Sequence, residues 1–132
     1  MNDRSSPQRV HLASARDDDD ESEVLVYLDV SLGILRLRSA REPCETFDPP
    51  PLLPRVTQGV WRHRAGGCYL VLGVAHDDRG GEPRVVYVRL YERPGFPVTV
   101  RRISVFTDSD VDGPRFEWIG TSEPQDEDSM GA

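Results

Sequence analysis

Residues 68–91 decide the fold, and they read CYLVLGVAHDDRGGEPRVVYVRLY. Two runs rich in aliphatic, β-branched and aromatic residues, 68–76 and 84–91, flank a segment, 77–83, that is dense in Asp, Gly and Pro. This pattern is typical of two β-strands joined by a turn. Gly73 interrupts the first run, which predicts a bulge or sharp bend of the kind that curves a sheet into a barrel.

Further short strands are expected on both sides of this hairpin. No helical pattern of ten or more residues competes with them between residues 58 and 120. Several short strands joined by tight turns predict the all-β class and a small antiparallel barrel rather than a sandwich. The additional strands are expected at residues 60–64, 96–100, 103–106 and 115–119.

Residues 24–38 precede this region and carry two aliphatic runs around Gly33. We expect an extra N-terminal β-hairpin that packs on an edge or an end of the barrel. The alternative is a helix, because leucines also recur here at helical spacing, at Leu25, Leu28, Leu32 and Leu35.

Residues 39–57 form a proline-rich connector that contains Pro49-Pro50-Pro51 and Pro54. Successive prolines favour polyproline II and exclude a helix or a central strand. The connector is interpreted as a stiff spacer. The alternative is a ligand for aromatic grooves of SH3 or WW domains, since Pro51, Pro54 and Arg55 have the required spacing.

The formal charge of −7 is concentrated at the two ends of the chain. Residues 1–23 hold seven acids against three arginines, and residues 121–132 hold four acids and no base. We expect both segments to be disordered acidic tails, because like charges repel and little apolar surface is available for burial. They are interpreted as solubilising tails or, alternatively, as arms that shield a basic face. Residues 57–106 hold eight arginines against four acids.

Composition excludes several classes of protein. No apolar stretch has the length of a membrane span, and two cysteines, Cys44 and Cys68, are too few for a disulfide scaffold. No targeting signal is visible, so we predict a cytoplasmic protein without a disulfide or a membrane partner. All sixteen basic residues are arginine, which favours a bacterial or phage source with GC-rich coding.

The chain resembles a known bacterial and phage family, the domain of unknown function 1653, over about residues 58–120. The order of the shared motifs carries this resemblance: Trp61-Arg62-His63, Gly66, Tyr69, Val71-Leu72-Gly73-Val74-Ala75-His76, Glu82, Val85-Val86-Tyr87, Leu90-Tyr91, Arg101, Phe106, Arg115-Phe116 and Trp118-Ile119-Gly120. The resemblance implies an SH3-like barrel and no particular activity. Thr99 stands where the family usually has an aromatic residue, and Arg102 where it usually has a proline.

Catalytic and metal-binding patterns are scarce. Cys68 with His63 or His76 is the nearest approach to a nucleophile and base, but a cysteine at the start of an apolar strand is typical of packing. The same three residues lack the paired spacing of a zinc site. We therefore predict no catalytic residue, no metal and no cofactor.

The leading hypothesis is a non-enzymatic binding module for a protein or a single-stranded nucleic acid. Its predicted site groups basic and aromatic residues, as ligand grooves of small barrels do: Arg62, His63, Tyr87, Tyr91 and Arg101. One alternative is that the tyrosines fill the barrel while the arginines coat it. Others are a structural stabiliser of another protein and an enzyme or accessory factor that acts on a nucleotide or small molecule, with His63 as acid or base. A shared site requires His63 and Tyr91 to lie on the same side of the core.

Overall fold

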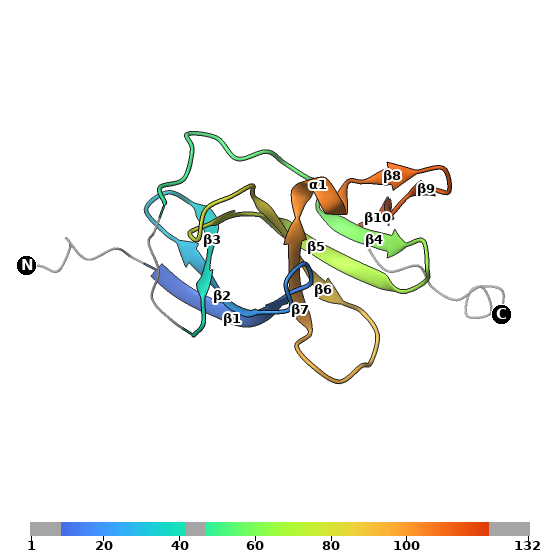
Figure 1. Ribbon diagram of the computed structural model, residues 1–132, viewed down its shortest axis with the longest axis horizontal. Coiled ribbons are helices and arrows are strands. Elements are labelled where there is room, and N and C mark those ends of the chain that lie inside the picture. Colours follow the sequence, from blue (N-terminus) through green and yellow to red (C-terminus); the bar gives the residue numbers. More distant parts are fainter. Residues whose placement is uncertain (1–8, 42–46, 122–132) are drawn as a thin grey trace, which may run out of the picture.

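A computed structural model describes residues 9–41 and 47–121 (Figure 1). Strands are the main secondary structure of these residues and the only helix among them is a single turn, so the predicted all-β class is confirmed. The elements in chain order are β1 (Arg9–Asp17), β2 (Glu23–Asp29), β3 (Ile34–Ser39), β4 (Gly59–His63), β5 (Cys68–Asp77), β6 (Arg84–Arg89), β7 (Val98–Arg102), α1 (Ile103–Phe106), β8 (Ser109–Asp110), β9 (Gly113–Pro114) and β10 (Phe116–Gly120).

The main sheet has eight strands in the order β10-β4-β5-β3-β2-β1-β7-β6. A further pairing of β5 with β6 closes six of these strands into a ring, with β4 and β10 continuing the sheet outside it. Figure 1 looks into this ring and shows β4 and β10 beside it. Residues 9–39 thus supply three strands of the ring, and the SH3-like character of residues 58–120 stays a prediction.

Strand β5 belongs to both parts of the sheet because it changes partner along its length. Its first half pairs antiparallel with β4, its last three residues pair parallel with β3, and its other edge pairs with β6. The register against β6 shifts between Val71 and Gly73, so the predicted irregularity at Gly73 is confirmed. The bulge lies between the two pairing regions and lets one strand serve two differently directed neighbours.

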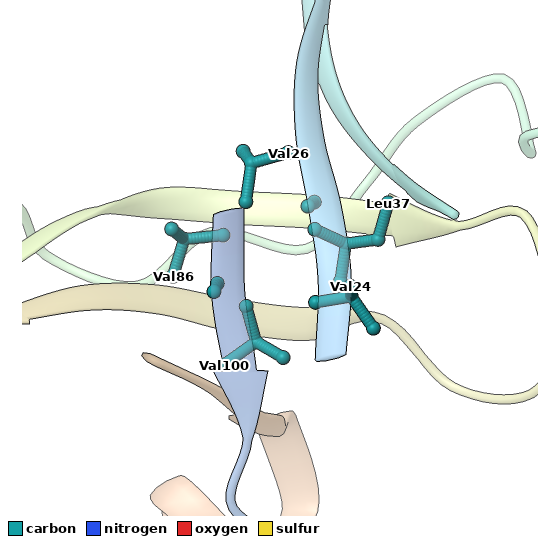
Figure 2. Close-up of a cluster of buried hydrophobic side chains, with 7 residues drawn as sticks. Val24, Val26, Leu37, Val86 and Val100 are labelled. Carbon is teal, nitrogen blue, oxygen red and sulfur yellow. The ribbon is translucent and has the colours of Figure 1, made fainter. Parts of the chain in front are cut away.

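Two hydrophobic clusters fill the molecule, and β6 contributes to both. Inside the ring, valines and other small aliphatic side chains point toward one another (Figure 2): Ala15, Val24, Val26, Leu37, Ala75, Val86 and Val100. On the other side of β6, a second cluster with aromatic side chains contains Val71, Val85, Tyr87, Phe106 and Phe116. Successive side chains of a strand face opposite ways, which is why Val86 joins one cluster while its neighbours join the other.

The prediction of a disordered tail over residues 1–23 is wrong for residues 9–23. Strand β1 pairs antiparallel with β2 along its length and, at its end, parallel with β7. Arginines distant in the sequence compensate the acidic run that follows, so the repulsion expected within that run does not prevent folding. Residues 1–8 and the predicted tail from residue 122 onward lie outside the described residues.

The predicted hairpin over residues 24–38 is present, and the alternative helix is wrong. Strands β2 and β3 pair from Val24 with Ser39 to Asp29 with Ile34. Gly33 closes the turn with a φ of 68°, and its N–H donates to the carbonyl of Asp29 at 2.7 Å. The hairpin forms part of the ring itself. Of the connector predicted over residues 39–57, Ser39 is the last residue of β3, and residues 40–41 and 47–57 contain no strand or helix.

The strand predicted at residues 103–106 is wrong, because this segment is the single helical turn α1. The N–H and the side-chain hydroxyl of Thr107 both donate to the carbonyl of Ile103, at 3.0 and 2.8 Å, and this closes the turn. In the described ranges, no helix is long and apolar enough to cross a membrane. Cys68 is a free thiol, and Cys44 lies outside these ranges.

A cluster of two carboxylates and two guanidinium groups joins the ends of β1, β5 and β6. Asp17 and Asp77 are almost fully buried. Asp17 accepts hydrogen bonds from Arg79 at 2.8 Å and from Arg84 at 2.7 Å, and Asp77 accepts from Arg79 at 2.9 Å. Burial alone would lower the pKa of Arg79, but its hydrogen bonds to Asp77 and Asp17 raise it. Arg79 is therefore charged in this cluster.

Removing one charge from this cluster should destabilise the fold. We expect Asp17→Asn to lower the free energy of unfolding by about 3 kcal/mol, because two partly buried arginines lose a shared partner. Urea denaturation followed by tryptophan fluorescence measures the change. Glu21→Gln is the control: its exposed carboxylate lies 3.5 Å from Arg16, and its loss should cost less than about 1 kcal/mol. Equal effects of the two substitutions would contradict a structural role for the buried cluster.

Candidate binding cleft

A cleft of about 300 Å³ lies where β1, β5 and β7 meet the loop that follows β6. This loop projects from the ring between β6 and β7 (Figure 1). Four arginines, three aromatic residues and one carboxylate contribute to the lining: Arg16, Arg89, Arg93, Arg101, Tyr69, Tyr91, Phe96 and Asp18. Guanidinium groups outnumber carboxylates four to one here, in a chain whose total charge is −7.

Tyr69 and Tyr91 form one wall of the cleft. Their rings meet edge to face at 5.5 Å, and their hydroxyls hydrogen-bond to each other at 2.5 Å. Burial and this hydrogen bond raise the pKa of Tyr69, so its hydroxyl stays protonated at physiological pH. Tyr91 remains 37% exposed, which leaves part of it open to a ligand.

Gly67 makes room for Tyr91. A Cβ atom built on Gly67 would lie 2.9 Å from the Tyr91 ring, and the φ of this glycine is 90°. Any residue other than glycine at position 67 would be strained, because its Cβ atom would clash with Tyr91 and its backbone would adopt an unfavourable φ. The turn before β5 therefore helps to set the position of the cleft's outer tyrosine.

The floor of the cleft is a hydrogen-bonded group of three residues. Asp18 accepts from the Tyr87 hydroxyl at 3.2 Å and from the Arg101 guanidinium at 3.0 Å. Tyr87 is buried in the second hydrophobic cluster, and burial raises its pKa. Its hydroxyl is consequently a permanent donor that fixes the Asp18 carboxylate.

Arg89 gives the loop wall its shape. Its guanidinium donates to the carbonyls of Phe96 and Arg93, both at 2.8 Å, and to that of Gly95 at 3.3 Å. One side chain thus ties three backbone groups of the loop to the end of β6. This arrangement preorganises the loop, and Arg93 and Phe96 are held beside the cleft.

His63 lies behind this site. Its ring packs edge-on against Phe116 at 4.9 Å, and Phe116 in turn contacts Tyr69. The Ala65 N–H donates to His63 Nδ1 at 3.0 Å. Burial, followed by the charges of neighbouring arginines including Arg101, lowers the pKa of His63. His63 is therefore connected to the cleft residue Tyr69 through Phe116, but His63 does not line the cleft.

The five predicted site residues have different positions relative to this cleft. Tyr91 and Arg101 line it, and Tyr87 supports its floor. His63 packs behind it, whereas Arg62 is exposed on the opposite face of β4 from Trp61 and His63. The buried Tyr87 agrees with the alternative that tyrosines fill the core, but Tyr91 does not. A binding role for any of the five stays a prediction.

The sequence-based prediction missed the other lining residues. Tyr69 begins a strand and is part of the family motif, so an aromatic residue near Tyr91 had a signal in the sequence. Asp18 and Arg16 had none, because they belong to the segment that was interpreted as a tail. In the described residues, no group of three or more His, Cys, Asp or Glu side chains has the geometry to hold a metal ion.

The structure is thus that of a small all-β protein with an arginine-rich cleft on its surface. Residues 59–118 match a family described as a protein of unknown function, DUF1653. A solved protein of that family from Bordetella bronchiseptica is 38% identical over 53% of this chain and 95% of its own, with a TM-score of 0.49. The chain therefore belongs to the DUF1653 family, as the motifs predicted. No curated protein matches it. Strands β1, β2 and β3 lie outside the residues that the family model matches.

The lowered pKa of His63 predicts how stability depends on pH. The unfolded chain binds a proton at about pH 6.5, whereas the folded chain resists it, so stability from this residue is present above that pH and is lost below it. We expect His63→Gln to reduce the loss of unfolding free energy between about pH 7.5 and about pH 5.5, measured by urea denaturation. His11→Gln, at an exposed position of β1, is the control. An unchanged pH profile in His63→Gln would contradict the assignment.

Proposed function

We propose that this chain is a non-enzymatic binding module and that its cleft takes single-stranded nucleic acid. In this proposal a base stacks on Tyr91 or Phe96, and the phosphates contact Arg93, Arg16 and Arg101. The observation that carries it is the juxtaposition of arginines and exposed aromatic rings in one cleft. Proteins that bind single strands combine these two features, because every base has a flat face and every nucleotide has a charge.

The charge of the cleft supports an anionic ligand. Phosphates attract guanidinium groups, which hold their charge at all physiological pH values and present a planar fork of donors. A chain with an overall charge of −7 repels polyanions at long range, so a locally positive cleft is required for such a ligand. The four arginines and single carboxylate of the lining meet this requirement.

The aromatic side chains favour a nucleic acid over an acidic peptide. Tyr91 and Phe96 are 37% and 38% exposed and lie beside the arginines of the cleft. The carboxylates of an acidic peptide would pair with the arginines but would offer no flat group to stack on these rings. A nucleotide has both a phosphate for the arginines and a base for the rings.

The surroundings of His63 do not support the enzymatic alternative. Its Nδ1 is occupied by a backbone N–H, and its ring is packed against Phe116 behind the cleft. In the described part of the chain, its hydrogen bonds connect it with no carboxylate or thiol. An acid–base catalyst must reach a substrate proton within hydrogen-bond distance, and His63 is not among the residues that line the cleft.

The proposal predicts salt-dependent binding of short single-stranded DNA or RNA, measured by fluorescence anisotropy of a labelled oligonucleotide. Tyr91→Ala should weaken binding by about fivefold or more through lost stacking. Arg93→Gln should weaken it and reduce the slope of log affinity against log salt by about 1. Arg62→Gln is the matched control, since it removes the same charge from the opposite face. An acidic peptide of equal charge serves as competitor.

Two results would contradict the proposal. One is no binding of any oligonucleotide at low salt. The other is an equal loss of affinity in Arg62→Gln and Arg93→Gln, which would indicate attraction by general charge rather than by the cleft. Tighter binding of the acidic peptide than of the oligonucleotide would assign the cleft to a protein partner.

A further inference from the structure

Acidic residues at and just after the end of β1 form ion pairs with arginines from residues 59–118, the part of the chain that matches the family. Asp17 contacts Arg79 and Arg84, and Asp18 contacts Arg101. The acids come from a segment outside residues 59–118, and these arginines come from inside it. The N-terminal segment thus supplies anions to a basic surface of the family domain.

Asp18 differs from Asp17 in its exposure and in the number of arginines that hold it. The Asp17 side chain is 0% exposed and is bonded to two arginines. The Asp18 side chain is 29% exposed, accepts from a single guanidinium nitrogen of Arg101, and lines the cleft. Its nearest atom to Arg16 is 3.8 Å away. Asp17 is therefore an anchor, whereas Asp18 is an accessible carboxylate inside the proposed binding site.

The pair of Asp18 and Arg101 leaves bonding capacity unused. Only one terminal nitrogen of Arg101 donates to Asp18, so the other terminal nitrogen takes no part in the pair. The Nε is buried, so a two-point contact with a ligand would use the two terminal nitrogens. A two-pronged contact between arginine and an oxyanion is stronger than a single one. Asp18 is consequently a weaker partner for Arg101 than a well-placed phosphate.

We propose that Asp18 is an intramolecular substitute for the anionic ligand and competes with it for Arg101. This inference rests on the proposed function of the cleft. A phosphate and the Asp18 carboxylate accept from the same guanidinium and repel each other, so a bound phosphate displaces the carboxylate.

The movement required for this exchange is small. The Asp18 N–H donates to the Val100 carbonyl at 2.9 Å, and the neighbouring Asp17 is fixed by its buried ion pairs. The backbone therefore stays in place while the Asp18 side chain rotates away from Arg101 and from the Tyr87 hydroxyl, and the bound phosphate accepts from that hydroxyl in its place. Competition by Asp18 lowers the affinity of the cleft for anions without any opening of the ring.

The decisive experiment compares Asp18→Asn with the wild-type chain in oligonucleotide binding by fluorescence anisotropy. We expect Asp18→Asn to bind about three- to tenfold more tightly, the size of a partly exposed ion-pair effect. Glu117→Gln, which removes a charge from the exposed side of β10 outside the cleft, should change affinity by less than about twofold. The gain should vanish when Asp18→Asn is made in an Arg101→Gln background. Asp18→Ser replaces Asp18→Asn if the latter does not melt cooperatively.

The outcomes separate this inference from the proposed function. Wild-type binding with no gain in Asp18→Asn would overturn the competition and leave the nucleic-acid site intact. Binding by Asp18→Asn alone would support the competition and would contradict the proposed function of the wild-type chain. If neither chain binds an oligonucleotide, the proposed function fails, and inorganic pyrophosphate becomes the probe. A larger increase in melting temperature with pyrophosphate for Asp18→Asn than for wild type would then support the competition, and equal increases would overturn it.

Discussion

The closure of the ring depends on the ion pairs of Asp17. Strands β1 and β7 share only a short parallel ladder, in which Arg16 lies opposite Thr99 and Asp17 opposite Val100. So short a ladder supplies little backbone hydrogen bonding to the seam. The Asp17 carboxylate strengthens it, because its contacts with Arg79 and Arg84 link the end of β1 to the turn after β5 and to β6. The ion pairs of Asp17 thus hold the ring closed between β1 and β7, where the backbone pairing is shortest.

The candidate cleft lies at this same seam, and the shortness of the ladder explains why. The pairing of β1 with β7 covers only Arg16 and Asp17 on β1, and the chain then turns, so Asp18 and Arg101 face each other through side chains instead of a ladder. The side chains of Asp18 and Arg101 are therefore accessible to a ligand, since their backbone is fixed by the neighbouring strands but the space beside them is the open cleft. The two hydrophobic clusters on either side of β6 keep the walls rigid.

Local patterns and family motifs in the sequence correctly predicted the strands on both sides of the turn after β5 and the irregularity at Gly73. The alternation in residues 84–91, the break at Gly73 and the turn-rich segment between them are local signals, and these strands are where they were expected. The position of Tyr91 and Arg101 in one cleft also agrees with the predicted site. The role of residues 17–21 was not predictable in this way. A run of acids reads as disordered unless its partners are known, and those partners lie about 60 or more residues away in the sequence.

The total charge of −7 is consequently a poor guide to what the cleft attracts. Near the seam, Asp17 and Asp18 neutralise the partly buried arginines that they contact. Arg93 is exposed and lies on the loop that follows β6, which the side chain of Arg89 holds in place. The cleft therefore has a compensated inner end at Arg101 and a positive outer end at Arg93. An anion that approaches meets the outer charge first, and its affinity is then set by whether it replaces the carboxylate at the inner end.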